Sequence, residues 1–320
     1  MDLQSIYLNV ELEGKFQRMS DESKGMILGV LGVTAFGLTL PATRFIIPYF
    51  DPVFIGLGRA VIASLVAAVL LIITKQKRPN RHQFHQLIVV ASGVVIGFPI
   101  LTAWAMQTVP ASHGGVVLGV LPLATAVAAA VVSNEKPSVG FWICGLAGSA
   151  IVILYTLLQG FGSFQFGDFL LIGAIVSAAM GYALGGKLSK ELGGWQVICW
   201  ALVISFPFIV VPAWLEAPQT NIDSLPLSVL LSFLYLALIS QLFGFFLWNK
   251  GLALGGISRV SQTQLLQPFV TLVASAYLIN ETVDLQTIVF AFLVIGIVAI
   301  GKQMPVYERR EEIIDLEFNL

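Results

Sequence analysis

Residues 122–135 read PLATAVAAAVVSNE, and residues 268–281 read PFVTLVASAYLINE. Seven of the fourteen positions are identical at a constant offset of 146 residues. Shared Ala and Val residues are expected by chance between apolar helices, whereas a proline, a threonine and an Asn-Glu pair at one offset indicate an internal repeat. The sequence therefore predicts two copies of one structural unit, and this duplication decides the fold.

The composition of the whole chain is that of a membrane protein. Hydrophobic residues make up 57% of the 320 positions, charged residues only 11%, and the mean hydropathy is +0.88. Because an ordinary soluble chain has about 25% charged residues, this chain cannot cover a water-facing surface. The net charge of −1 argues against nucleic-acid binding, which needs a basic face. Cys144 and Cys199 both lie inside apolar runs, so neither a disulfide framework nor a cysteine metal site is expected.

Apolar runs long enough to cross a bilayer, which takes about 20 residues, recur between turn-formers and charges. They are too continuously apolar for the alternating strands of a membrane barrel. We therefore predict an all-α integral membrane protein with ten transmembrane helices, over residues 25–44, 53–74, 86–108, 112–133, 139–158, 168–187, 196–215, 226–247, 258–279 and 284–303.

The basic residues orient these helices. If the N-terminus is cytoplasmic, 15 of the 17 lysines and arginines fall in cytoplasmic segments, and only Arg44 and Arg59 lie inside predicted helices. This distribution follows the positive-inside rule and predicts that both termini are cytoplasmic. Five helices separate the repeated segments, and because five is odd, the two halves are expected to be inverted relative to each other.

The predicted organisation is two inverted five-helix repeats with short flanking segments. An N-terminal cytoplasmic or interfacial segment precedes the first repeat, an extracytoplasmic linker joins the repeats, and a cytoplasmic tail follows the second. These five parts cover residues 1–24, 25–158, 159–167, 168–303 and 304–320.

Several short motifs resemble those of one group of transporters. They are Phe36-Gly37, Asp51-Pro52 followed by Arg59 and Ala63, Pro122 with Glu135, Gly167-Asp168, and Pro268 with Glu281. Over about residues 25–303 the chain resembles the drug/metabolite transporter superfamily, specifically bacterial carriers built from two EamA domains; Phe36 departs slightly, because the family often has Trp there. The resemblance implies a ten-helix carrier of small metabolites in the bacterial inner membrane. Helices 1–4 and 6–9 would line a central cavity, with helices 5 and 10 at the periphery.

Arg59 is a candidate for binding the substrate. It lies seven residues past Pro52, which is roughly 10 Å into the membrane at about 1.5 Å per residue. A charge at membrane depth costs at least about 2.5 kcal/mol, so Arg59 is expected to face the bundle interior. It would either anchor a carboxylate or phosphate, or be a structural arginine held by carbonyls or acids. Arg44, at the outer end of helix 1, is interpreted as snorkelling to the interface or as a second cation of the cavity.

Pro122 and Pro268 occupy equivalent positions in the two repeats. Each is expected in the middle of a helix, where it would remove one backbone hydrogen bond and free the carbonyl groups of Leu118 and Gln264. The kink is either a gating hinge or a static feature of packing.

Three titratable residues lie at the ends of the same helices. Glu135 and Glu281 close them on opposite membrane faces, and each is interpreted as a helix cap or as a protonatable gate. His113 begins helix 4 and is either an ordinary hydrated polar residue or a proton sensor.

Polar residues are concentrated in the second repeat. Gln264 and Gln267 share a helix face by their spacing, and Gln241 lies in the preceding helix. They are interpreted as recognising the solute, with hydrogen bonding between helices as the alternative. Trp104 and Trp248 are candidates for the cavity wall.

These features predict a secondary transporter, an exporter or facilitator, for small polar or amphipathic metabolites such as amino acids. Its expected partners are the small-molecule substrate and the lipid bilayer, and a homodimer is left open. No GxxxxGK[ST] or HExxH motif occurs, so neither ATP-driven pumping by this chain nor a bound cofactor or metal is expected. The alternatives are an intramembrane enzyme and a membrane scaffold that transports nothing.

Overall fold

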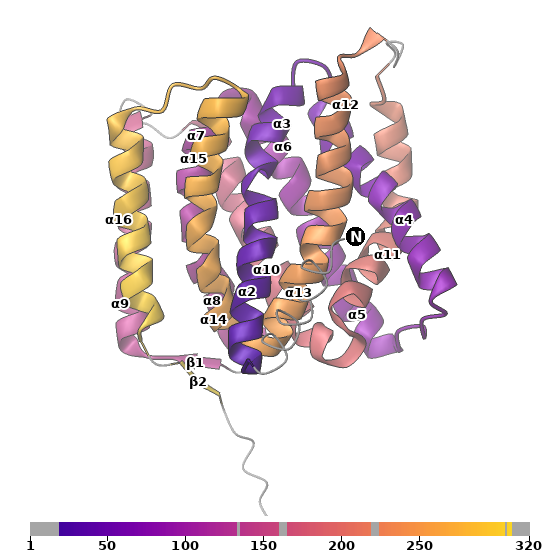
Figure 1. The fold of residues 1–320 in the computed structure, drawn as a ribbon, viewed down its shortest axis with the longest axis horizontal. Coiled ribbons are helices and arrows are strands. Elements are labelled where there is room, and N and C mark those ends of the chain that lie inside the picture. Colours follow the sequence, from indigo (N-terminus) through magenta and orange to yellow (C-terminus); the bar gives the residue numbers. More distant parts are fainter. Residues whose placement is uncertain (1–18, 133–134, 160–164, 219–223, 305, 309–320) are drawn as a thin grey trace, which may run out of the picture.

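The computed structural model describes residues 19–132, 135–159, 165–218, 224–304 and 306–308. They form a bundle in which the long helices lie side by side along a common direction (Figure 1). Helix starts are marked by side-chain caps: the Ser20 hydroxyl accepts from the Ser23 amide, and Asn80 forms a capping box with Gln83. Two strands of three residues each are the only departure from an all-helical fold within these ranges.

The first half of the chain contains the following elements, in which η marks a π or 3₁₀ segment. They are α2 (Asp21–Gly37), α3 (Thr39–Ile46), η1 (Phe54–Gly58), α4 (Arg59–Ile73), α5 (Arg81–Val90), η2 (Ala91–Gly97), α6 (Phe98–Thr108), α7 (Ala111–Val117), η3 (Leu118–Val120), α8 (Leu121–Val132), β1 (Glu135–Pro137) and α9 (Val139–Gln159).

The second half contains the remaining elements. It contains α10 (Phe166–Leu192), α11 (Gly194–Leu215), α12 (Leu227–Leu234), η5 (Tyr235–Phe243), α13 (Gly244–Gly255), α14 (Ile257–Ser261), η6 (Gln262–Leu266), α15 (Gln267–Leu278), α16 (Leu285–Lys302) and β2 (Val306–Glu308).

Seven helical runs of the described chain are long and apolar enough to cross a membrane. They are Asp21–Ile46, Phe54–Ile73, Arg81–Thr108, Ala111–Val132, Phe166–Leu192, Gly194–Leu215 and Leu227–Gly255. Shorter apolar helices, Val139–Tyr155 and Leu285–Ile297, lie at the predicted fifth and tenth spans. The predicted ninth span is helical throughout 257–278, but its glutamines make it less apolar than the others. The chain is thus a multi-pass helical membrane protein, while the count of ten and the orientation stay predictions.

The backbone irregularities repeat at the same offset as the sequence. The π-helical segment η2 covers 91–97, and adding 146 gives 237–243, which lies inside the π-helical segment η5. The 3₁₀ segment η3 covers 118–120, and adding 146 gives 264–266, which lies inside the 3₁₀ segment η6. Two copies of one unit therefore share their helix defects as well as their Pro and Asn-Glu residues.

Helix packing also follows the repeat. The pair α2 and α13 corresponds to the pair α10 and α6, because exchanging the two halves converts one into the other. The same exchange leaves the pairs α4–α11 and α9–α16 unchanged, because each pair consists of equivalent helices of the two halves. Figure 1 shows α9 and α16 together at one edge of the bundle, as expected for the fifth helix of each repeat.

Glycines bring two of these helix pairs into backbone contact. A Cβ atom added at Gly25 of α2 would lie 2.6 Å from the amide nitrogen of Gly255 in α13. A Cβ atom at Gly93 of η2 would lie 2.4 Å from the carbonyl oxygen of Ser177 in α10. Small residues at such points allow the close helix approach that membrane interiors favour.

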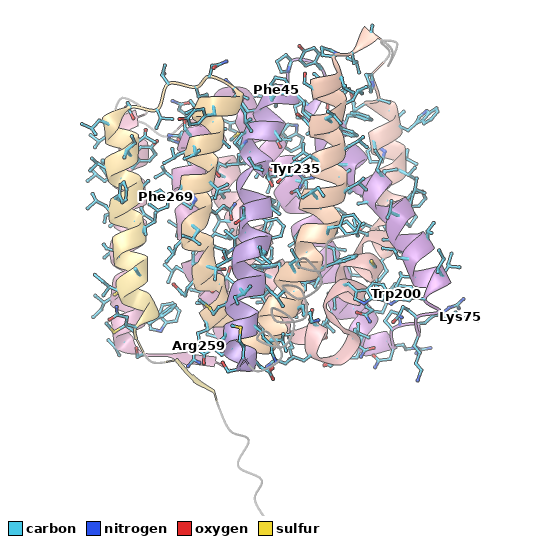
Figure 2. The ribbon with its side chains drawn as sticks, viewed as in Figure 1. Phe45, Lys75, Trp200, Tyr235, Arg259 and Phe269 are labelled. Carbon is cyan, nitrogen blue, oxygen red and sulfur yellow. The ribbon has the colours of Figure 1, made fainter. Side chains whose placement is uncertain are left out.

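The two short strands lie at one end of the bundle. In β1 and β2, Glu135 pairs with Glu308 and Pro137 pairs with Val306 in an antiparallel register. The start of α2 and the end of α16 lie at this same end in Figure 1. The basic residues Lys75 and Arg259 also lie toward this end (Figure 2), and which side of the membrane it faces stays a prediction.

Candidate functional site

A small cavity lies at the centre of the bundle, where the two repeats meet. Its volume is about 10 Å³, which is about the least space that a water molecule needs. Five lining residues come from the first half and four from the second: Phe36, Thr39, Arg59, Val94 and Phe98, and Tyr182, Ser240, Phe245 and Gln267.

Two pairs of lining residues occupy equivalent repeat positions. Phe36 and Tyr182 are separated by 146 residues, and so are Val94 and Ser240. The rings of Phe36 and Tyr182 stack with their centroids 6.3 Å apart. The cavity therefore contacts corresponding surfaces of both halves, which is where a transporter built from inverted repeats binds its solute.

Aromatic rings form one wall of the cavity. Phe36 contacts Phe245 at a centroid distance of 5.0 Å, and Tyr182 contacts Trp248 at 5.2 Å in an edge-on arrangement. Trp248 is fully buried, and its indole Nε1 has no hydrogen-bond partner among the described residues. Trp248 packs against the lining rings of Phe36 and Tyr182 but does not itself line the cavity, so its predicted place in the cavity wall stays a prediction.

Arg59 supplies the positive charge of the cavity. It is the first residue of α4, directly after the π-helical segment η1, and it is only 3% exposed. The described residues form three ion pairs, none of which includes Arg59, and its Nε atom has no hydrogen-bond partner. Tyr182 and Tyr235 lie close enough to interact with it electrostatically. The expectation that Arg59 faces the interior agrees with this geometry, and no acid pairs with it in the described chain.

The cation belongs to one repeat only. The position equivalent to Arg59 is Ser205, since 59 plus 146 gives 205, and the Ser205 hydroxyl donates to the Ala201 carbonyl of its own helix. A symmetric scaffold would not need this difference. Equivalent residues of both repeats therefore line the cavity, whereas its one charged lining residue comes from the first repeat.

The polar side of the cavity comes from α15, η5 and α3. Thr39 and Ser240 are hydrogen-bonded to each other, with their oxygens 2.8 Å apart. Gln267 is buried and its amide oxygen has no partner in the described chain, while Gln241 donates to the Val94 carbonyl at 3.0 Å and leaves its own oxygen unpaired. These amides keep hydrogen-bonding capacity that their neighbours do not use.

The other glutamine of the predicted recognition face has a different environment. Gln264 lies in the 3₁₀ segment η6, is 1% exposed, and both polar atoms of its amide lack a partner among the described residues. It does not line the central cavity. A role for it in recognition stays a prediction.

Arg44 and Trp104 lie outside the central cavity. The guanidinium of Arg44 is half-buried and donates to the Met106 carbonyl of α6, so in this structure it is bound within the bundle rather than extended toward the interface. Trp104 is 39% exposed on the surface of α6. Their predicted roles in substrate binding stay predictions.

The two prolines sit at helix starts rather than in the middle of regular helices. Pro122 and Pro268 are each the second residue of a helix that follows a 3₁₀ segment. The carbonyls of Leu118 and Gln264 accept hydrogen bonds from the residues three positions later. Our expectation that proline frees these two carbonyls is wrong, because the 3₁₀ turns give them new donors.

The structure describes the side chain of Glu281 but only the backbone of Glu135. The Glu281 carboxylate accepts the amides of Ala111 and Ser112 at 2.9 and 3.0 Å, so it caps helix α7 of the other repeat. The backbone of Glu135 belongs to β1, and its side chain lies outside the described part of the structure. A gating role for either residue stays a prediction.

His113 forms a buried polar pair. Its Nε2 atom lies 2.7 Å from Oδ1 of Asp168, the Tyr155 ring stacks on it at 5.2 Å, and both members of the pair are almost fully buried. Asp168 also accepts the Gln165 amide in the capping box that starts α10. Sequence reasoning missed Asp168 as a partner, although a Gln165–Asp168 spacing before an apolar run is itself a signal of a capped helix start.

The aromatic lining residues were also missed. Tyr182 places a hydroxyl inside an otherwise apolar span, which is the available signal in the sequence. Phe245 carries no comparable signal, because phenylalanine is common on lipid-facing surfaces as well.

The chain belongs to the EamA-like transporter family, whose model matches residues 23–157 and 165–301. It is 43% identical over 285 residues to the "Uncharacterized transporter YdeK" of Bacillus subtilis (strain 168), covering 89% of this chain and 99% of that protein. It is 22% identical over 295 residues to the "Probable terminal-alkyne amino-acid exporter" of Streptantibioticus cattleyicolor, covering 90% and 97%. A solved crystal structure shares the fold, with a TM-score of 0.67 at 15% identity over 89% of this chain and 99% of that chain. The resemblance to two-domain EamA carriers is thereby confirmed.

Proposed function

We propose that this protein is a secondary transporter that moves small carboxylate-bearing metabolites, such as amino acids, across the bacterial inner membrane by alternating access. Ten transmembrane helices in two inverted five-helix repeats, with both termini in the cytoplasm, would rock about the central cavity. The absence of an ATP-binding motif from the sequence favours a secondary transporter, an exporter or facilitator, over an ATP-driven pump.

One observation carries the proposal: Arg59 is a buried cation without an anion. A buried charge normally has a partner, because an unpaired one costs several kcal/mol. The described residues supply no carboxylate to Arg59, while they place an unpaired amide oxygen of Gln267 and an unpaired indole N–H of Trp248 nearby. A solute carboxylate would complete the ion pair, and an ammonium group would find the free acceptor.

The size of the cavity requires movement. A volume of about 10 Å³ is too small for a metabolite, so the helices around the cavity would have to separate for a solute to bind. The π-helical segments η1, η2 and η5 carry or adjoin the lining residues Arg59, Val94 and Ser240. Such segments occur frequently at functional sites, and their irregular hydrogen bonding lets a helix change register at little cost.

Relatives with transporter names support the class of function. The name of the Streptantibioticus protein describes an amino-acid exporter, and amino acids carry the carboxylate that Arg59 lacks. An intramembrane enzyme does not agree with these names, and a static scaffold gives no reason for a lone buried cation in a cavity lined by both repeats.

The proposal is tested by uptake into liposomes that contain the purified protein. The panel comprises amino acids and matched amines without the carboxylate, and the variants are Arg59→Ala, Arg59→Lys and Arg259→Ala. Truncating one partner of a buried charge pair costs at least about 2 kcal/mol, so Arg59→Ala is expected to lower amino-acid uptake at low concentration by at least roughly thirtyfold.

Arg259→Ala is the matched control, because Arg259 is 59% exposed and pairs with Glu22 at the surface. It is expected to transport like the wild type, and Arg59→Lys is expected to be intermediate. Equal uptake by Arg59→Ala and Arg259→Ala at equal protein levels would contradict the proposal.

A further inference from the structure

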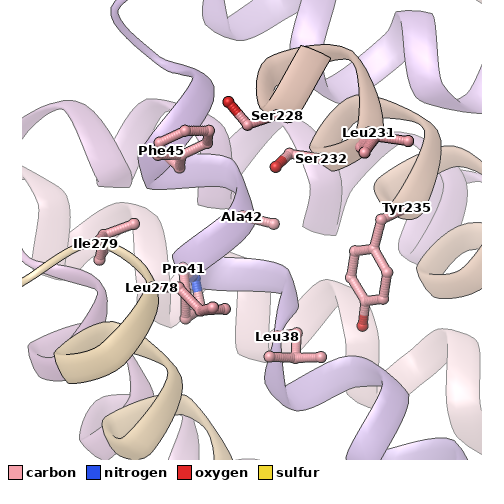
Figure 3. Close-up of a pocket in the computed structure, with 10 residues that line it drawn as sticks. All are labelled: Leu38, Pro41, Ala42, Phe45, Ser228, Leu231, Ser232, Tyr235, Leu278 and Ile279. Carbon is pink, nitrogen blue, oxygen red and sulfur yellow. The ribbon is translucent and has the colours of Figure 1, made fainter. Parts of the chain in front are cut away.

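An apolar groove lies between α3, α12 and the end of α15 (Figure 3). Its volume is about 310 Å³, against about 10 Å³ for the central cavity. One wall is the face of α3 with Pro41, Ala42 and Phe45, and the opposite wall is the face of α12 with Leu231 and Ser232. Leu231 is 56% exposed, so the groove opens on the outer surface of the bundle, which is the surface that meets lipid.

Tyr235 separates this groove from the central site. Its ring lines the groove, opposite Leu38 and Ala42 in Figure 3. Its hydroxyl donates to the carbonyl of Ala35 in α2, and its segment η5 packs against α4, the helix that begins with Arg59. A single phenol ring, tied to the neighbouring helix by one hydrogen bond, thus stands between a lipid-facing groove and an unpaired buried cation.

The backbone at this partition is irregular on both sides. Tyr235 is the first residue of the π-helical segment η5, which also carries Ser240 of the central site. Leu38, on the opposite side, is the break between α2 and α3. Because neither helix is a regular α-helix here, the ring can turn aside through local changes of both helices rather than a movement of the whole bundle.

We propose that the groove binds the hydrocarbon side chain of the transported solute while Arg59 binds its carboxylate, so that the substrate class is amphipathic carboxylates. This inference rests on the proposed function. The groove has the size of a small-molecule site, and its walls are almost wholly carbon. A hydrocarbon tail suits the groove and an anion suits Arg59, so the two sites together match a solute that has both.

The position of the groove next to the central site favours the transported solute over a bilayer lipid as its occupant. A second apolar groove of about 510 Å³ lies on the α15 side of Leu38, against Phe269 and Val273, and it is not lined by Tyr235. An acyl chain of the bilayer fits either groove equally well. Only the α12 groove is lined by a residue of η5, Tyr235, and η5 packs against α4, which begins with Arg59.

The test measures uptake of straight-chain 2-amino acids whose side chains have one to six carbons, in liposomes of one lipid composition. Each methylene buried in the groove is expected to lower the half-saturating concentration about fourfold until the groove is full. Ser232→Leu fills the groove and is expected to abolish this dependence on chain length. Ser92→Leu is the matched control, because Ser92 is exposed on η2, away from the groove.

The outcomes separate this inference from the proposed function. If uptake by the wild-type protein does not depend on chain length while the Arg59→Ala variant loses uptake, the groove proposal is wrong and the carboxylate site stands. If Ser232→Leu lowers the uptake of short and long amino acids equally, or if uptake follows the acyl-chain length of the bilayer lipids instead, the groove does not bind the solute.

A second measurement does not depend on the folding of a variant. A 2-amino acid with a diazirine in its side chain is photolysed on the wild-type protein, and labelled peptides are identified. Labelling of 38–45 and 227–235, competed by unlabelled long-chain amino acid, is expected. Labelling confined to other helices would overturn the proposal.

Discussion

The link between Glu281 and helix α7 gives a prediction whose size follows from the geometry. Pro110, at the N-cap of α7, offers no side-chain acceptor to the free amides of the first turn. Glu281 accepts two of them, those of Ala111 and Ser112, at 2.9 and 3.0 Å from the other repeat. Glu281→Ala therefore removes both a cap and a negative charge at a helix N-terminus.

Loss of a side-chain cap costs about 0.5–2 kcal/mol, and loss of the charge at the helix dipole about 0.3–1 kcal/mol more. We expect a total of about 2 kcal/mol for Glu281→Ala. At roughly 2–4 °C per kcal/mol in chains of a few hundred residues, the Tm falls by about 4–8 °C. Glu281→Gln keeps one neutral acceptor, so about half of this decrease is expected.

The assay uses a thiol-reactive dye in detergent at a fixed heating rate, because membrane proteins often unfold irreversibly. Cys199 is fully buried and becomes reactive on unfolding, and Cys144→Ser leaves it as the single reporter. The control is Glu22→Ala, which removes a 54% exposed carboxylate from a surface pair worth about 0–1 kcal/mol. Equal melting of Glu281→Ala and Glu22→Ala would refute the reasoning.

Two further stability predictions use the same assay. In a double-mutant cycle of His113→Ala and Asp168→Asn, a coupling of about 1–3 kcal/mol is expected, because the buried pair is 2.7 Å apart; additive effects would show that the two side chains do not support each other. Gly25→Ala is expected to destabilise by about 1–3 kcal/mol, since its Cβ would lie 2.6 Å from the Gly255 amide, whereas Gly296→Ala, with nothing within 4 Å, is expected to be neutral or slightly stabilising. Equal Tm values for the two glycine variants would contradict this account of helix contact.

The sequence is enough to predict the repeat and the membrane helices. The length of an apolar helix and the placement of basic residues are set by the bilayer alone. The offset of 146 residues found in the sequence reappears in the positions of η2 and η5. The position of Arg59 inside the bundle follows for the same reason, because a charge cannot face lipid.

The partners of the site residues could not be predicted in the same way. His113 finds Asp168 from the other half of the chain, and Glu281 caps a helix 169 residues away from it in sequence. Such contacts depend on how the repeats dock, and periodicity within one helix carries no information about docking. The 3₁₀ turns before Pro122 and Pro268 were missed for a local reason, since a proline pattern alone does not distinguish a kink from a helix restart.

The glycine contacts between α2 and α13 and between η2 and α10 set which parts can move independently. Where two backbones touch with no side chains between them, neither helix can rotate or slide without separating a surface that nothing else can fill. Each pair is therefore expected to move as one rigid unit made of one helix from each half. In the proposed transport cycle, two such rigid pairs would tilt past one another to change which side is open.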